Sequence, residues 1–328
     1  MADNNFPLYA LAFLLTFILT TLICKVLIPL LTQKAEQPIY EDGPSWHASK
    51  SGTPTMGGLS FLISISLVML LSSVFLFLER DTYSAISLLT CLCYGVMNSI
   101  VGIIDDSTKL KRRQNKGLSP TQKLVLQFLL SALFLAARYW LLKDANDTSL
   151  IIGGLDISYL YYPVATLILV GITNCANLTD GIDGLASGVA FAGAVSVFYI
   201  SYAAYSEVSF ISSSLIGATI GFLIFNINPA KIFMGDTGSL FLGALLASLA
   251  IAMNKPPLIL LVGGVYVIEG ASVIIQVLFY KLTKKRVFKM APFHHHLEKC
   301  GWSENKICMS AIIVTFILSV VAYVIYLP

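Results

Sequence analysis

Charged residues are scarce in this sequence of 328 residues. Asp, Glu, Lys and Arg make up 12% of it, whereas 56% of the residues are hydrophobic. Because soluble globular domains carry about 25% charged residues, this composition excludes an ordinary soluble domain. The apolar residues also gather in blocks, many of them longer than the roughly 20 residues that cross a bilayer as a helix. The sequence therefore predicts a polytopic protein embedded in a lipid bilayer.

Other patterns are missing as well. The apolar blocks lack the alternation of a barrel strand, so helical spans are expected. The first block, 7–31, is too long and lacks the basic start of a cleavable signal, which favours a span. No pair among the six cysteines has zinc-finger spacing, which favours small apolar residues over metal ligands. No internal repeat is evident, no nucleic-acid partner is expected, and residues 1–328 are predicted to form a single membrane domain.

The apolar blocks predict about ten transmembrane helices and an all-α polytopic fold. The spans are expected at approximately 8–31, 57–78, 84–104, 123–142, 161–177, 185–205, 210–226, 239–254, 258–280 and 307–327. Connections after odd-numbered spans hold nearly all Lys and Arg, with clusters at 109–113 and 284–286. By the positive-inside rule these connections are cytoplasmic, so both termini are predicted to be extracytoplasmic. A small outer β-hairpin is predicted near 149–158, where paired glycines separate two short apolar runs.

Three groups of aspartates stand at span ends on the predicted cytoplasmic side. They are Asp105 with Asp106, Asp180 with Asp183, and Asp236. A charge at the bilayer centre costs at least ~2.5 kcal/mol, and placement at a span end avoids much of that cost. From the residues alone, the adjacent pair 105–106 could bind a divalent cation or could be a solvated helix end.

The other two groups lie in glycine-rich loops. The segment 177–184 makes a tight turn that could hold a nucleotide, or that could be selected only for its glycines. In the segment 226–239, Asp236 opens a helix at a place where backbone amides favour anionic groups. Such a carboxylate suits Mg²⁺, which binds one or two carboxylates together with substrate phosphates. Phe233 could stack on a base or be ordinary apolar surface.

The chain has four histidines, and three of them are consecutive at 294–296. Three consecutive side chains cannot all bind one metal from one helix face. An interfacial segment whose imidazoles contact phosphates is therefore predicted in preference to a zinc site. Glu269 stands alone near the middle of the ninth predicted span. An intramembrane acid is a functional candidate by default, and a buried hydrogen bond to a neighbouring helix would also explain it.

Together these motifs resemble the polyprenyl-phosphate N-acetylhexosamine-1-phosphate transferase superfamily, and within it the bacterial phospho-N-acetylmuramoyl-pentapeptide transferases. The resemblance covers the whole chain, with ten spans and a motif in each of five cytoplasmic loops. The segment 50–58 opens the second span as in that family, and 105–106, 177–184 and 233–236 follow in the expected order. The most specific motif is 290–298, because relatives that transfer N-acetylglucosamine phosphate usually carry a different histidine-containing loop.

The resemblance implies transfer of phospho-N-acetylmuramoyl-pentapeptide from UDP-N-acetylmuramoyl-pentapeptide to undecaprenyl phosphate, giving lipid I and UMP in peptidoglycan synthesis. It implies a homodimer in the bacterial cytoplasmic membrane, with the active site on the cytoplasmic face. It also implies Mg²⁺ held by Asp236, with Asp180 as a second candidate ligand. The implied catalytic residues are Asp105, Asp106, Asp236 and His294. The implied substrate-binding residues are Lys50, Thr55, Lys109, Lys123, Asn177, Asp180, Gly181, Asp183, Asn226, Phe233, Gln276, His295 and His296.

A phosphate monoester acceptor has a second pKa near 6, so most of it is dianionic at pH 7 and hardly needs a strong general base. Direct attack by the lipid phosphate on the sugar-bearing phosphorus is therefore favoured over a covalent intermediate on an aspartate. Two other functions remain open. A sister transferase would use UDP-N-acetylglucosamine with the same fold and metal. A secondary transporter or flippase would place its polar site near the midplane between repeated halves, and here the acids gather at one face instead.

Overall fold

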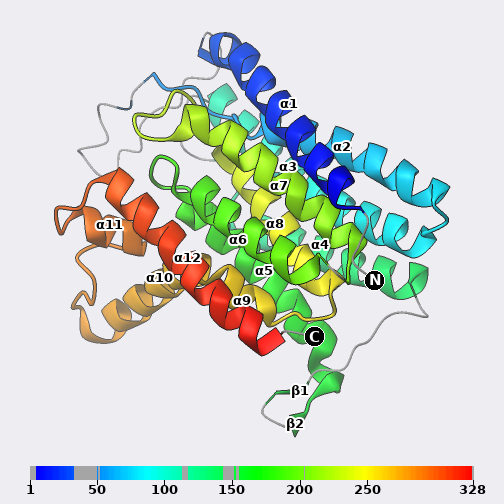
Figure 1. Cartoon of the computed structure of the whole chain (residues 1–328). Helices are drawn as coiled ribbons and strands as arrows, with labels where there is room; N and C mark the ends of the chain where they lie inside the picture. The colour runs from blue at the N-terminus through cyan, green and yellow to red at the C-terminus, as the bar shows by residue number, and fades with distance from the viewer. Residues whose placement is uncertain are drawn as a thin grey trace.

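The computed structural model describes residues 5–32, 50, 52–112, 117–142, 151–152, 155–202 and 204–326, and they form a bundle of helices (Figure 1). The elements in chain order are α1 (Phe6–Thr32), α2 (Leu59–Leu78), α3 (Thr82–Arg112), α4 (Pro120–Leu141), β1 (Ile151–Ile152), β2 (Leu155–Asp156), the 3₁₀ helix η3 (Ser158–Leu160), α5 (Tyr161–Thr179), α6 (Leu185–Ser201), α7 (Ser206–Asn226), α8 (Gly235–Ala252), α9 (Leu258–Val262), α10 (Gly264–Thr283), α11 (Phe293–Glu298) and α12 (Glu304–Tyr326).

Nine helices in the described part of the chain are long and apolar enough to cross a membrane. The remaining predicted span, 185–205, corresponds to α6, which is also apolar but has only 17 residues. The prediction of an all-α polytopic membrane protein is confirmed. One continuous span was predicted over 258–280, and this was wrong. The helix α9 ends at Val262 and α10 begins at Gly264. Two consecutive glycines, 263 and 264, weaken a helix at this point.

Two further boundaries differ from the prediction. The third span was expected to end at residue 104, but α3 continues to Arg112. The eighth was expected to begin at residue 239, but α8 begins at Gly235. Apolar blocks mark the lipid-facing length of a helix, whereas backbone hydrogen bonds carry the helix on into polar sequence. The aspartates at 105, 106 and 236, predicted at the ends of spans, therefore lie within α3 and α8.

The start of α4 is fixed by a capping box. The Ser119 hydroxyl accepts a hydrogen bond from the backbone N–H of Gln122 at 3.2 Å, and the Gln122 side chain accepts one from the backbone N–H of Ser119 at 2.9 Å. Pro120 occupies the first helical position, where its missing N–H costs nothing. This arrangement holds Lys123 in the first turn of α4.

The helix α8 lies at the centre of the bundle and is buried along almost its whole length (Figure 1). It packs against α3 on one side and α5 on another. A Cβ atom at Gly102 would lie 2.3 Å from the backbone oxygen of Asp236. Only glycine therefore lets α3 approach the start of α8 this closely, and the approach brings the acidic end of α3 to that start.

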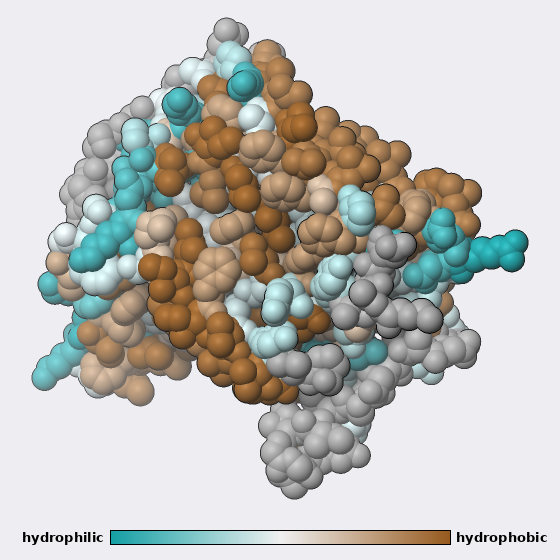
Figure 2. Space-filling model, in the orientation of Figure 1, coloured by the Kyte–Doolittle hydropathy of each residue, from teal (hydrophilic) through white to brown (hydrophobic). Residues whose placement is uncertain are grey.

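Apolar side chains cover a broad part of the surface, and hydrophilic side chains lie around it (Figure 2). Exposed leucine, isoleucine and valine side chains follow α1, α2, α4, α10 and α12. Lipid tails are as apolar as these side chains, so such faces are stable in a bilayer.

The N-terminal end of α1 and the C-terminal end of α12 lie toward the end of the bundle that carries β1 and β2 (Figure 1). The helix α11 lies at the other end. Strands β1 and β2 pair antiparallel, with Ile151 opposite Asp156 and Ile152 opposite Leu155. The rest of the predicted hairpin, 149–150 and 153–154, lies outside the described residues.

Candidate active site

Three carboxylates gather where the end of α3 meets the start of α8. One oxygen each from Asp105, Asp106 and Asp236 lies within 4.8 Å of the others. Asp106 and Asp236 are 130 positions apart in the sequence, so only the packing of the two helices joins them. Carboxylates this close repel one another unless cations are present. The cluster is therefore a place where the protein or a ligand must supply positive charge.

Two lysines supply part of that charge. Lys109 Nζ lies 2.6 Å from Asp105 Oδ2 and 3.4 Å from Asp236 Oδ1. Lys123 Nζ lies 3.0 Å from Asp105 Oδ2 and also contacts Asp236 Oδ2. Among the residues that the structure describes, three carboxylates face two ammonium groups, which leaves a formal excess of one negative charge. A divalent cation that brings phosphate with it fits this balance.

Asp106 organises the start of α8. Its Oδ1 accepts a hydrogen bond from the backbone N–H of Asp236 at 3.2 Å. Its Oδ2 accepts one from the backbone N–H of Thr237 at 2.9 Å and one from the Thr237 hydroxyl at 2.7 Å. A carboxylate at a helix N-terminus satisfies unpaired amides and favours the helix dipole. Asp106 thereby fixes the backbone of the first turn of α8, and with it the direction in which the Asp236 side chain points.

The carboxyl end of α5 forms another side of the site. The Asn177 side-chain amide donates hydrogen bonds to Asp236 Oδ1 at 3.1 Å and to the Ser239 hydroxyl at 2.8 Å. Asp180 caps the end of α5 and is not part of the three-carboxylate group. Burial raises the pKa of Asp180 well above its usual value, and the nearby carboxylates of Asp236 and Asp106 raise it further. This side of the site is therefore short of positive charge.

Asp183 joins three segments at the edge of the site. Its Oδ1 lies 2.7 Å from Lys50 Nζ, which lies at the same distance from Glu304 Oε2. Its Oδ2 accepts hydrogen bonds from the Asn228 side chain at 2.9 Å and from the backbone N–H of Ala230 at 3.0 Å. Glu304 was missed from the sequence, although an acid directly before an apolar block in a basic loop is a signal that could have found it.

Two other predicted site residues hold loops in place. The buried Asn226 side chain accepts hydrogen bonds from the backbone N–H of Gly184 and the Ser187 hydroxyl, and it donates one to the backbone oxygen of Ile232. The Gln276 side-chain oxygen accepts from the backbone N–H groups of residues 287 and 288 at 3.1 and 2.9 Å. Asn226 thus holds the turn after α5 against the segment before α8, whereas Gln276 holds the connection between α10 and α11.

The segment that precedes α2 runs beside the start of α8. The backbone N–H of Phe233 donates to the Pro54 oxygen, and the Phe233 oxygen accepts from the N–H of Gly57, both at 2.8 Å. Thr55 lies beside Gly235, and its buried hydroxyl has no hydrogen-bond partner among the described residues. A buried polar atom of this kind is rare in native proteins and is a candidate to bind a ligand.

The three consecutive histidines have three different environments. His294 is fully buried, with Nδ1 3.1 Å from Glu269 Oε2. His295 Nδ1 lies 2.6 Å from Glu298 Oε2. His296 Nδ1 accepts a hydrogen bond from the backbone N–H of residue 289 at 3.1 Å. His294 is thus the partner that sequence reasoning could not name for Glu269.

The predicted residues fall into three sets. Those in contact around the carboxylates are Asp105, Asp106, Lys109, Lys123, Asn177 and Asp236. Those that surround this centre, in the turns and segments beside it, are Lys50, Thr55, Asp180, Gly181, Asp183, Asn226, Phe233 and His294. Those that lie on α10 and α11, toward residues 287–289 and Glu298, are Gln276, His295 and His296.

Comparison with known proteins adds a family to this geometry. Residues 88–254 match the model of glycosyl transferase family 4, and residues 50–62 match phospho-N-acetylmuramoyl-pentapeptide-transferase signature 1. Proteins named phospho-N-acetylmuramoyl-pentapeptide-transferase are similar along almost the whole chain. The one from Halalkalibacterium halodurans is 41% identical, covering 92% of each chain. The one from Caldicellulosiruptor bescii is 39% identical, covering 95% of each. The chain therefore belongs to the phospho-N-acetylmuramoyl-pentapeptide-transferase family.

Proposed function

We propose that this chain is the transferase that moves phospho-N-acetylmuramoyl-pentapeptide from its UDP carrier to undecaprenyl phosphate, giving lipid I and UMP. The observation that carries the proposal is the cluster of Asp105, Asp106 and Asp236 with two lysines at one end of a membrane bundle. A lipid acceptor needs a site at headgroup level, and a charged donor needs a water-facing one. The junction of α3, α4 and α8 is suited to both.

The carboxylate cluster fits Mg²⁺. Its donors are all oxygens, as Mg²⁺ prefers, and the cluster holds an excess of negative charge. Asp105, Asp106 and Asp236 are the residues that would hold the ion. When bound, Mg²⁺ supplies charge neutralisation at the phosphates. Asp180 belongs in this proposal as a neighbouring carboxyl that a cation or a substrate hydrogen-bond donor would stabilise.

The chemical step follows from the charges in the site. An oxygen of the lipid phosphate forms a bond to the sugar-bearing phosphorus, and the bond from that phosphorus to the bridging oxygen of the pyrophosphate breaks. UMP leaves with the electron pair. The main barrier is the approach of one anion to another, and Lys109 and Lys123 are placed to neutralise it. Asn177 orients Asp236 through its hydrogen bond, so that the groups around the phosphates are fixed before reaction.

The surface beside Lys123 is suited to a lipid acceptor. Leu124 and Phe128 follow it on α4 and are 42% and 41% exposed on the apolar outer face. A lipid phosphate held near Lys123 would leave its tail along this face. The basic connections near the carboxylates support a cytoplasmic orientation in a bacterial membrane. A homodimer is also part of the proposal, supported by the family resemblance, and sedimentation in detergent tests it.

The experiment that tests the function is UMP release by purified protein with undecaprenyl phosphate and Mg²⁺. UDP-N-acetylmuramoyl-pentapeptide and UDP-N-acetylglucosamine are compared as donors. We expect release only with the first donor, and we expect chelation to abolish it. Release only with the second donor would assign the sister activity. No release with either, from folded protein, would contradict the proposal.

A further inference from the structure

Glu269 is a buried acid on α10 that the transfer described above does not use. Its side chain accepts the backbone N–H of His294 at 3.1 and 3.2 Å through its two oxygens, and its Oε2 lies 3.1 Å from His294 Nδ1. An acid deep in an apolar bundle costs free energy unless hydrogen-bond donors satisfy it. Such an acid is a candidate for a functional residue. Here a single residue provides those donors through its main chain and its ring.

These contacts fix both the position and the orientation of the imidazole. The bond to the backbone N–H anchors the first turn of α11 on α10, and the bond to Nδ1 sets the rotation of the ring. With Nδ1–H donated to Glu269, Nε2 is the ring nitrogen that remains for a ligand. The carboxylate thus determines which nitrogen of His294 faces the turn after α5.

The described residues offer that nitrogen no hydrogen-bond partner. Nε2 of His294 is buried and makes no hydrogen bond within the described part of the chain. It faces Gly181, where a Cβ atom would lie only 2.3 Å from it. Only glycine leaves the ring in place, and Gly181 stands between Asp180 and Asp183 in the turn beside the carboxylate cluster. A buried ring nitrogen without a partner points to a ligand atom that binds it.

We propose that Glu269 is a positioning residue of the transferase, which holds His294 so that Nε2–H donates to a phosphate oxygen of the nucleotide sugar beside Gly181. An imidazole between two anions donates from both nitrogens, one to each. The ligand class is an oxyanion, and the proposal rests on the proposed function because the donor substrate supplies that oxyanion.

A double-mutant cycle on the full-length protein tests this. We expect Glu269→Ala to lower kcat/KM for UMP release about 100-fold, and by no more than about fivefold when His294→Ala is already present. In that background the ring that Glu269 positions is already gone, and only the bond to the backbone N–H is left to lose. The dissociation constant of the donor, measured by calorimetry, provides the same cycle if His294→Ala is too slow to assay. Equal losses from Glu269→Ala in both backgrounds, or no loss in either, would overturn the proposal.

Two other variants separate positioning from a merely structural role. Glu269→Gln still accepts the backbone N–H but lacks the charge, and we expect about a tenfold loss with an unchanged melting temperature. Glu207→Gln is the matched control, a buried acid on α7 far from His294, and should leave kcat within twofold. A loss in Glu207→Gln as large as in Glu269→Gln would show a general effect of buried acids and would contradict the proposal.

A spectroscopic measurement keeps this inference separate from the proposed function. In protein labelled with ¹⁵N-histidine, the ring signals of His294, assigned by their loss in His294→Ala, report which nitrogens carry hydrogen. We expect Glu269→Gln to shift the Nδ1 signal in the absence of any substrate. If wild-type protein released no UMP but this shift occurred, the proposed reaction would fail while the Glu269–His294 pair stood. If the wild type released UMP but Glu269→Gln left the Nδ1 signal unchanged, the proposed positioning of His294 by Glu269 would be refuted and the proposed reaction would stand.

Discussion

Two acids are buried in different regions of this bundle, and their surroundings differ. Glu269, 3% exposed, holds His294 near the carboxylate cluster, where negative charge is in excess and one ring nitrogen is left for a ligand. Glu207, 1% exposed, lies at the opposite end, in the first turn of α7. It accepts a hydrogen bond from the Ser87 hydroxyl at 3.4 Å, and that hydroxyl accepts one from the buried Arg138 at 3.0 Å.

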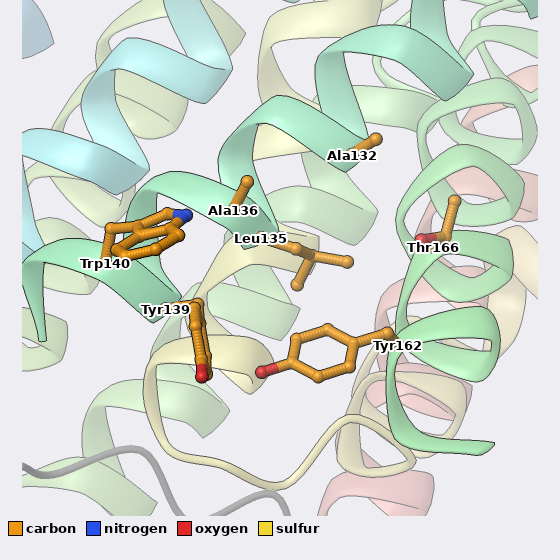
Figure 3. A pocket seen from close by; sticks show the side chains of 7 residues that line it. All are labelled: Ala132, Leu135, Ala136, Tyr139, Trp140, Tyr162 and Thr166. Atoms are coloured by element: carbon orange, nitrogen blue, oxygen red, sulfur yellow. The ribbon is translucent and has the colours of Figure 1, made fainter. Parts of the chain in front are cut away.

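Two cavities repeat this contrast. One of about 450 Å³ lies between α4 and α5 at the Arg138 end, and its lining is mostly apolar (Figure 3). It is formed by Ala132, Leu135, Ala136, Tyr139, Trp140, Tyr162 and Thr166. Another of about 470 Å³ adjoins the ion pairs of Lys50 and is lined by Asn228, Glu298, Lys299, Trp302, Ser303 and Glu304. The two acids are buried to a similar extent and the two cavities have similar volumes, so neither property marks the site. The excess of carboxylates over lysines at the cluster does.

The largest expected effect is at the carboxylate cluster. Asp236→Asn removes the charge that both lysines contact but leaves the backbone N–H that Asp106 binds. We therefore expect UMP release to fall at least about 10³-fold, which corresponds to about 4 kcal/mol of transition-state stabilisation, while the melting temperature stays near wild type. Rates are measured over a series of Mg²⁺ concentrations. A loss below tenfold would show that Asp236 is not part of the reacting centre.

At the opposite end, the expected effect is on stability alone. Arg138→Met removes the guanidinium that is linked to Glu207 through the Ser87 hydroxyl, and loss of a buried hydrogen bond to a charged group costs about 1.5–3 kcal/mol. We expect a lower unfolding midpoint in detergent, with kcat unchanged per folded molecule. Combining it with Glu207→Gln should recover part of the stability. A fall in kcat at full stability would place this end in the reaction and remove the contrast between the two regions.

Lys123→Gln sharpens the comparison of charges within the site. Among the described residues, it leaves Lys109 as the one lysine that contacts both Asp105 and Asp236. We expect about a 100-fold lower kcat for UMP release, close to 2.7 kcal/mol, because less charge opposes the approaching phosphates. Lys281→Gln, at the exposed end of α10, is the matched control and should stay within twofold. Equal losses in the two variants would indicate a general effect of basic charge on donor binding.

Asn226→Ala distinguishes a loop support from a substrate ligand. The resemblance implies a role for Asn226 in substrate binding, whereas its side chain bonds three protein groups. Loss of those bonds should lower stability by about 1–2 kcal/mol, with a modest rise in KM for the donor. Thermal unfolding and initial rates measure the two effects. Unchanged stability with a large rise in KM would favour direct contact with the substrate.

Sequence reasoning located the acidic groups because charges are conspicuous in apolar sequence. It placed them at the ends of spans but did not predict how far the helices extend, since α3 runs on past its apolar block to Arg112. The pairing of Lys123 with Asp236 joins residues 113 positions apart, and local patterns carry no information on such a contact. The partner of Glu269 was hidden for the same reason. Hydropathy predicts where a chain enters lipid, whereas packing determines which polar groups meet.

The smallest expected effect is at the apolar cavity between α4 and α5. Trp140 lines it and is 66% exposed on the lipid-facing surface, so truncation removes few contacts within the protein. We expect Trp140→Ala to change stability by less than about 0.5 kcal/mol, as surface substitutions do, and to leave kcat within twofold. The measurements are thermal unfolding and UMP release at saturating substrate. If KM for the lipid acceptor rose tenfold instead, the acceptor tail would extend along α4 to this cavity, and the two ends of the bundle would share one substrate.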